Sequence, residues 1–316
     1  MKRVINFCRT QGKLVFKGED SRFMLFTGIK ITGISIVTFL MSFYFLVMVL
    51  RLNFVFFESK GYPKLQMLEQ AWFEYVFAEA LEILIYVFFF HVSLFFIGMY
   101  VGHVILRPFR VIGEYCRKVI ENPNAVYKVD DFSTYKLLTH FSEFFFEYLR
   151  ESRKRGSILS NSIPPQYQRV HKPVFDRIFI FHFAFLLAIV SISSTFFIVE
   201  MLSSIYSNMI ELSLKTLKHD PSLAEFFMNQ NFIYDHIVII TVSLMVVLYT
   251  LLGLHLYSSV SGAAFGIFAT MRAFMKGNYF SRVHLIGYSY IREHTRHLNK
   301  YLDYIQNNYD KEPPKG

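Results

Sequence analysis

Apolar residues gather in four long runs that are separated by polar stretches. The runs cover residues 27–50, 80–106, 178–201 and 235–257. Each contains about 20 largely apolar residues, the length that a helix needs to cross the hydrocarbon core of a bilayer. The pattern therefore predicts an all-α integral membrane protein with four transmembrane helices.

A second pattern follows the second and fourth runs, where apolar residues recur in steps of four and three. This spacing places them on one face of a helix, as in the seam of a coiled coil. The first seam comprises Ile105, Phe109, Ile112, Cys116 and Val119, and its steps recur 155 residues later at Val260, Ala264, Ile267, Met271 and Phe274. Each seam is predicted to continue the preceding membrane helix.

Another seam follows each of these after a break in the helical pattern. Leu138, Phe141 and Phe145 match Ile291, His294 and Leu298, which lie 153 residues further on. One break contains Pro123 and the other Gly277, and both residue types end helices. In the second break, Val283 and Leu285 are expected to pack the connector against the helices. Four seams in matched order predict an internal duplication.

The pattern divides the chain into seven segments. Residues 1–26 form a basic N-terminal segment, 27–106 a transmembrane hairpin, 107–152 a helix–connector–helix segment and 153–177 a basic linker. The second half repeats this order with a hairpin at 178–257, a helix–connector–helix segment at 258–306 and a polar tail at 307–316. The linker is expected to be a solvated, flexible hinge.

Residues 258–306 resemble a HAMP domain, the relay module of bacterial chemoreceptors and sensor kinases, and residues 107–152 resemble a more diverged copy. Pro108 lies where this family often has a proline at the start of the first helix. The stretch KGNYFSRVHL at 276–285 is similar to the family's connector of glycine and hydrophobic residues. The second copy departs from the family pattern at Ala263, where proline is expected.

The resemblance implies a parallel four-helix bundle, built in this family from two helices of each of two chains, which passes small rotations or shifts from membrane helices to an output domain. Because this chain has two copies, one molecule is expected to supply all four helices as an intramolecular pseudo-dimer. A homodimer with two separate bundles is the alternative. Only fifteen residues follow Tyr301, so a membrane or cytoplasmic partner protein is expected to provide the output.

Charge predicts the orientation in the membrane. Residues 1–30, 107–177 and 258–316 carry 28 Lys and Arg, whereas 51–82 and 200–236 carry five. Because basic loops stay on the cytoplasmic side, both termini and the middle loop are predicted to be cytoplasmic. This orientation predicts a multi-pass membrane protein, and the resemblance to bacterial relay modules implies a bacterial inner membrane. Its net charge of +9 is accounted for by anionic lipid head groups and needs no nucleic acid.

Candidate chemistry is sparse. Four histidines lie in or beside the apolar runs, at positions His91, His103, His182 and His255. A bis-histidine haem needs two of them on facing helices, and their depths favour snorkelling or hydrogen bonding instead. Gly98 and Gly102 form a GxxxG motif that permits close helix approach. Since no catalytic or metal-binding motif is found, no enzymatic activity, cofactor or metal is expected.

These expectations favour a non-enzymatic relay or adaptor that modulates a partner protein through its HAMP-like bundle. The alternative is an accessory or scaffold subunit of a larger membrane complex, such as a motor, secretion or transport machine, in which the bundle only docks. A transporter or channel with two parallel repeats, or a haem-binding membrane protein, is a further alternative.

Overall fold

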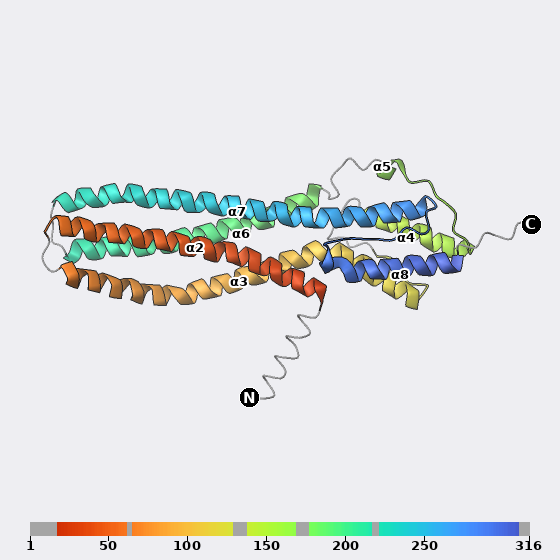
Figure 1. Ribbon diagram of the computed structural model, residues 1–316, viewed down its shortest axis with the longest axis horizontal. Helices are drawn as coiled ribbons and strands as arrows, with labels where there is room; N and C mark the ends of the chain where they lie inside the picture. The colour runs from red at the N-terminus through yellow and green to blue at the C-terminus, as the bar shows by residue number, and fades with distance from the viewer. Residues whose placement is uncertain (1–17, 62–64, 129–137, 169–176, 217–220, 310–316) are drawn as a thin grey trace, which may run out of the picture. The chain divides into compact units, whose positions relative to one another are not determined.

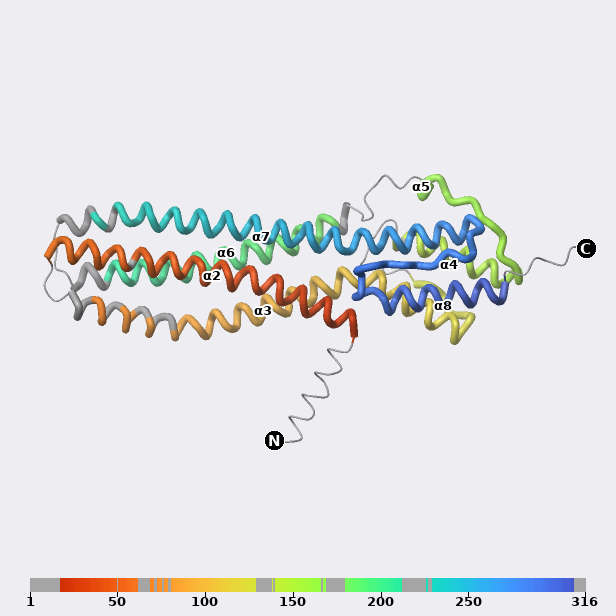
Figure 2. The backbone as a smooth tube through the Cα atoms, viewed as in Figure 1, coloured from red at the N-terminus to blue at the C-terminus, as the bar shows by residue number. Residues whose placement is uncertain are grey.

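The chain is all-helical in its computed structural model, which describes residues 18–61, 65–128, 138–168, 177–216 and 221–309 (Figures 1 and 2). Of these residues, 87% are helical and none lies in a β-strand. The elements are α2 (Glu19–Ser59), α3 (Leu65–Glu121), α4 (Leu138–Arg155), α5 (Pro165–Gln168), α6 (Arg177–Thr216), α7 (Pro221–Met275), the short 3-10 helix η1 (Ser289–Ile291) and α8 (Arg292–Tyr309). The prediction of an all-α protein is thereby confirmed.

Four of the described helices, α2, α3, α6 and α7, contain stretches long and apolar enough to cross a membrane. Each contains one of the four predicted apolar runs. The helices extend well beyond these runs, so the connections at 51–82 and 200–236 are largely helical. The helix α3 begins at Leu65, well before its apolar run, and no glycine or proline interrupts it up to residue 97. Gly61, with a φ of 69°, follows the end of α2 and permits the turn there.

The chain forms two compact units. Unit 1 comprises residues 1–27, 99–185 and 254–316, and unit 2 comprises residues 28–98 and 186–253. Unit 1 therefore contains α4, α5, η1 and α8 together with the C-terminal parts of α3 and α7. Unit 2 contains the larger part of the predicted membrane spans.

The core of unit 2 is formed by packing among α2, α3, α6 and α7. Phe90 of α3 stacks on Phe197 of α6 with ring centroids 4.1 Å apart. The hydroxyls of Ser42 on α2 and Thr241 on α7 lie 2.7 Å apart. Contacts of this kind join helices from both halves of the sequence inside one unit.

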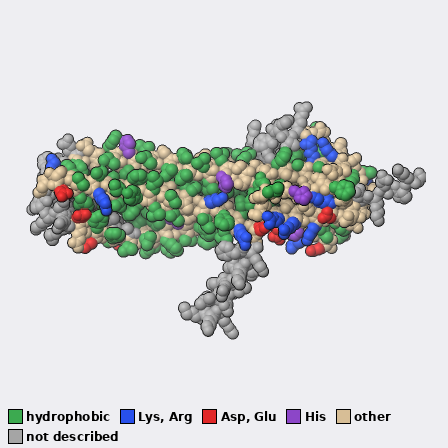
Figure 3. Space-filling model, viewed as in Figure 1, with side chains coloured by type: hydrophobic (Ala, Val, Ile, Leu, Met, Phe, Trp, Pro, Cys, Tyr) green, Lys and Arg blue, Asp and Glu red, His purple; other side chains and the backbone are tan. Residues whose placement is uncertain are grey.

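The surface differs between the two units. On the face drawn in Figure 3, hydrophobic side chains cover most of unit 2, whereas Lys and Arg gather on unit 1. Large apolar residues of unit 2 such as Phe88, Phe196 and Ile239 are more than half exposed. An apolar surface of this extent suits contact with lipid tails, which agrees with a membrane protein.

Candidate functional site

The predicted seam residues all lie in the interior of unit 1. Each is at most 7% exposed: Ile105, Phe109, Ile112, Cys116, Val119, Leu138, Phe141, Phe145, Val260, Ala264, Ile267, Met271, Phe274, Ile291, His294 and Leu298. The a/d spacing thus identified the buried faces of four helical segments.

The helices α3 and α4 run parallel in unit 1. The rings of Tyr115 on α3 and Phe146 on α4 lie 4.6 Å apart between centroids. Further along both helices, Nη1 of Arg153 donates a hydrogen bond to the carbonyl of Pro123 at 3.0 Å. Residue numbers increase together in these two contacts, which shows that the two helices point in the same direction.

The connector between α7 and α8 runs back beside α7 (Figure 1). It begins after Gly277, whose φ of 99° is a backbone conformation that glycine adopts without steric cost. A Cβ built on Gly266 of α7 would lie 2.5 Å from Cδ2 of Leu285. Tyr288 lies against Gly262, one turn earlier. The connector therefore runs antiparallel to α7, and α8 starts beside the earlier turns of that helix.

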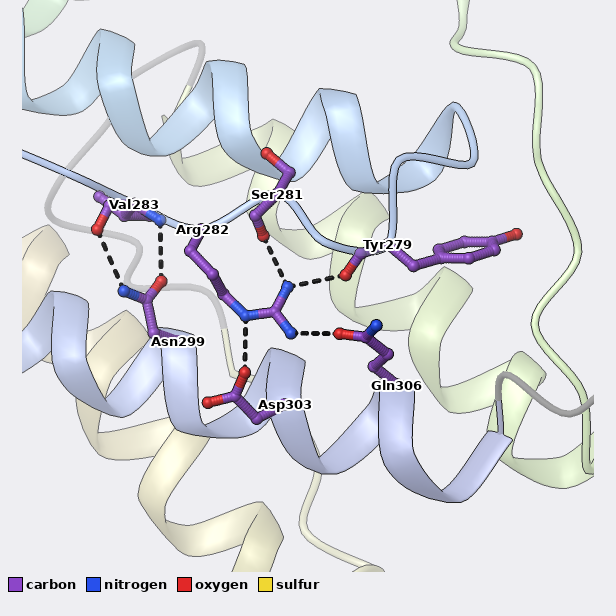
Figure 4. A network of polar contacts seen from close by, with 7 residues as sticks. All are labelled: Tyr279, Ser281, Arg282, Val283, Asn299, Asp303 and Gln306. Atoms are coloured by element: carbon purple, nitrogen blue, oxygen red, sulfur yellow. Dashed lines mark hydrogen bonds and ion pairs between the residues drawn. The ribbon is translucent and has the colours of Figure 1, made fainter.

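Polar contacts fasten this connector to α8 (Figure 4). The backbone N–H of Val283 donates to Oδ1 of Asn299 at 2.8 Å, and Nδ2 of Asn299 donates back to the Val283 carbonyl at 3.0 Å. The Arg282 guanidinium donates to Asp303 at 2.7 Å, to Gln306 and to the carbonyls of Tyr279 and Ser281. Because its guanidinium donates hydrogen bonds both to α8 and to the connector itself, Arg282 holds the connector in a defined position.

The two halves of the sequence contact each other within unit 1. Phe141 and Phe145 of α4 lie against Phe268 and Phe274 of α7, with ring centroids 4.6 and 6.2 Å apart. On α3, a Cβ built on Gly113 would stand 2.9 Å from Cβ of His294 on α8. Residue numbers rise together in these α4–α7 pairs and, for α3 and α8, from Gly113–His294 to Tyr115–Tyr301, so the four helical segments are parallel. They pack as a four-helix bundle in unit 1.

Tyr301 of α8 lies in the middle of this bundle. Its ring is within 6.4 Å of Tyr115 and 6.2 Å of Phe146, between centroids. Burial raises the pKa of the Tyr301 phenol well above its ordinary value, because the phenolate would lose its hydration. The hydroxyl is therefore neutral and belongs to the packing of the bundle.

The linker between the halves, predicted to be a solvated, flexible hinge, makes defined backbone contacts in its first part. The helix α4 continues to Arg155, and Ile158 and Ile163 are then buried. The N–H of Ile158 donates to the Tyr309 carbonyl at 3.1 Å, and the N–H of Asn161 donates to the Met275 carbonyl at 3.0 Å. These bonds satisfy carbonyls at the ends of α8 and α7. Residues 156–163 therefore have defined backbone partners at these helix ends, while Gly156 and residues 159–162 are exposed.

One polar cluster interrupts the apolar interior of the bundle. Oδ2 of Asp20, in the first turn of α2, accepts a hydrogen bond from Nε2 of His294 at 2.8 Å. The same oxygen lies 3.4 Å from Nε of Arg110, whose Nη1 lies 3.2 Å from Nδ1 of His103. Oδ1 of Asp20 is buried without a hydrogen-bond partner among the described residues. The beginning of the first membrane helix is thereby tied to α3 and α8.

Two further contacts join the start of α2 to α8 and to η1, which precedes it. Glu19 and Arg292 form an ion pair at 3.6 Å. The rings of Phe23 and Tyr290 lie 4.6 Å apart, and the Tyr290 hydroxyl donates to the Ser259 carbonyl at 2.8 Å. Sequence reasoning identified His294 only as a seam residue and missed Asp20. A histidine in an otherwise apolar seam, with acidic residues near a helix start, is the signal that could have indicated the pair.

The remaining predicted positions do not form a second site. Pro123 is exposed after α3, whereas Gly98 and Gly102 are buried where α3 approaches α2. His182 and His255 are exposed. Within the described ranges, no group of three or more His, Cys, Asp or Glu side chains is arranged to hold a metal ion.

The sequence and the fold were compared with known proteins. No family model matches the sequence, and neither a curated protein nor a solved structure matches the chain.

Proposed function

We propose that the protein is a non-enzymatic relay or adaptor of a bacterial inner membrane, with both termini in the cytoplasm. Residues 107–152 and 258–306 act as two HAMP-like segments of one pseudo-dimeric bundle. Movements of the membrane helices shift this bundle, and the bundle modulates a partner protein. The continuity of α3 and α7, which extend over 57 and 55 residues, is the observation that carries the proposal.

Continuity supports a relay because a helix transmits rotation or translation along its axis. Both helices include a predicted span and end in seam residues of the bundle. Pro108 lies inside α3 without ending it. Proline removes one backbone hydrogen bond and bends a helix, which gives α3 a place to flex close to the start of its seam.

The contacts between the halves support duplication of a HAMP-like segment. Phe141 lies against Phe268. In the proposed repeat, His294 occupies the position that corresponds to Phe141, 153 residues earlier. Gly113 likewise corresponds to Phe268, 155 residues later. His294 and Gly113 are also in contact. The two halves thus make corresponding contacts, as the two chains of a HAMP dimer do by symmetry.

Exposed apolar residues on the second connector supply a surface for the partner. Phe280 is 80% exposed and Ile286 is 96% exposed. Both belong to unit 1 and flank the part of the connector around Arg282 that is hydrogen-bonded to α8. Two large apolar side chains held in solvent on an ordered connector favour a protein contact.

The partner surface is tested by photo-crosslinking in cells with p-benzoylphenylalanine at position 280 or 286. We expect one discrete adduct of higher mass at these positions and none from position 126, where Val126 is exposed on the first connector. A Phe280→Ser, Ile286→Ser double variant is expected to lose at least tenfold of the captured partner while its Tm changes little, because both side chains are exposed. Equal adducts from all three positions would refute this docking surface.

The alternative function, an accessory or scaffold subunit, uses the same surface without movement of the bundle. Locking the bundle by a disulfide between Gly113→Cys and His294→Cys separates the two functions. A relay keeps its partner but loses regulation of the partner's activity when locked. A locked scaffold keeps both its partner and the partner's normal activity.

A further inference from the structure

The interior of unit 2 carries a row of hydroxyl groups on α2. Thr32, Ser35, Thr38 and Ser42 are buried. Their spacing of three, three and four residues places them on one face of the helix. This face is turned into the unit and away from lipid.

Three of these hydroxyls have no hydrogen-bond partner within the part of the chain that the structure describes, namely those of Thr32, Ser35 and Thr38. Elsewhere in unit 2, the hydroxyls of Thr241 and Thr250 donate to the carbonyl one turn earlier at 2.7 Å. Such a bond is the usual arrangement for threonine in a membrane helix. The three hydroxyls on α2 instead make no such hydrogen bond to their own helix backbone, and they face the interior.

His91 of α3 presents a further buried polar atom. Its Nδ1 lies 2.7 Å from the Val87 carbonyl. Because a carbonyl can only accept, Nδ1 carries the proton and Nε2 of the neutral ring is an acceptor. The His91 side chain is 7% exposed, and its Nε2 finds no partner among the described residues.

The helix register places His91 opposite Ser35. A Cβ on Gly98 would touch Gly28, whereas a Cβ on Gly102 would touch Met24, so α2 and α3 are antiparallel. Seven residues separate Gly28 from Ser35 and Gly98 from His91. Seven residues are two turns, which return to nearly the same face of each helix. The acceptor of α3 and the donors of α2 therefore meet at one depth.

Two other helices bring polar atoms to this region of unit 2. The Tyr249 hydroxyl of α7 donates to the Ile31 carbonyl at 3.0 Å and lies 3.3 Å from the hydroxyl of Ser194 on α6. Ile31 precedes the unpartnered Thr32, one turn before Ser35. All four helices of the unit thus contribute a polar side chain here.

We propose that unit 2 binds a small cluster of water molecules between His91, Thr32, Ser35 and Thr38. Buried polar groups in a membrane span require partners. Water is the ligand that can donate to Nε2 of His91 and accept from the neighbouring hydroxyls at the same time. The cluster gives the membrane unit a hydrated polar centre, separate from the bundle of unit 1.

The cluster is tested on the unmodified full-length chain in lipid bilayers by water-edited solid-state NMR with ¹⁵N-labelled histidine. The His91 signal is assigned by its loss in His91→Gln. We expect polarisation to pass from water to Nε2 of His91 nearly as fast as to the exposed His236, whose Nδ1 makes the same bond to a carbonyl one turn earlier. Build-up at His91 more than tenfold slower than at His236 overturns the proposal.

A stability measurement tests the hydroxyls independently. Thr38→Val keeps the side-chain shape and removes the hydroxyl. If water binds there, the variant loses hydrogen bonds and its Tm falls by several degrees. If the site is dry, removal of an unpartnered buried hydroxyl raises the Tm, and the proposal fails. Thr250→Val, whose side chain is exposed, is the matched control and is expected to leave the Tm within one or two degrees.

Discussion

A Gly98→Leu variant is expected to lose the close packing of α2 against α3 and to unfold at a markedly lower temperature. A Cβ on Gly98 would stand 2.7 Å from the Cα of Gly28, a backbone atom that cannot turn aside. Overpacking costs about 1–3 kcal/mol, and a leucine in contact with backbone should reach the upper end of that range. Thermal unfolding in detergent micelles, followed by near-UV circular dichroism, measures the loss.

Gly33→Leu is the matched control for this variant. Gly33 lies on α2 only five residues after Gly28, and nothing lies within 4 Å of a Cβ placed there. Its replacement is expected to leave the Tm unchanged or to raise it, because glycine is a poor helix former by about 1 kcal/mol. Equal losses from Gly98→Leu and Gly33→Leu would contradict the close approach of the two helices.

Phe145→Ala is expected to loosen the bundle of unit 1. The Phe145 side chain is fully buried and lies against Phe146 and Phe274. Truncation of such a phenylalanine costs about 3–5 kcal/mol. A loss of 3 kcal/mol increases the opened population about 100-fold, so limited trypsin digestion at the arginines of α4 should accelerate to a similar extent.

Phe280→Ala provides the control, because it deletes the same atoms from a side chain that is 80% exposed. Its digestion rate at α4 is expected to match that of the unmodified protein. If Phe145→Ala accelerated cleavage less than threefold, Phe145 would not be a core residue of the bundle.

Much of this fold could be predicted from periodicity. The membrane runs are recognisable because their length matches the bilayer. Residues such as Cys116 and Met271 could be assigned to the interior because a/d spacing holds over each seam. Both are fully buried. Gly98 was identified by its GxxxG spacing, and it lies at a close helix contact.

The helix ends and the polar contacts could not be predicted in the same way. The extension of α3 back to Leu65, ahead of the apolar run, is permitted by the absence of a helix breaker and is not marked by hydrophobicity. Asp20 meets His294 only because residues 274 positions apart are brought together by the fold. Backbone bonds such as Ile158 to Tyr309 leave no mark on the sequence pattern, since every residue type except proline offers the same N–H.

The measurement that tests the central claim most directly is disulfide formation between Gly113→Cys and His294→Cys, with Cys8→Ser and Cys116→Ala. A Cβ placed on Gly113 would stand 2.9 Å from Cβ of His294. The Cβ–Cβ distance in a disulfide is about 3.8 Å, so the helices need to separate by only about 1 Å. A protease site is inserted between residues 172 and 173. If the two halves form one bundle within a chain, the oxidised protein runs as a monomer on a non-reducing gel before cleavage, and after cleavage its two fragments stay joined until they are reduced. A disulfide-linked dimer before cleavage, or no bond under oxidant, would contradict the account.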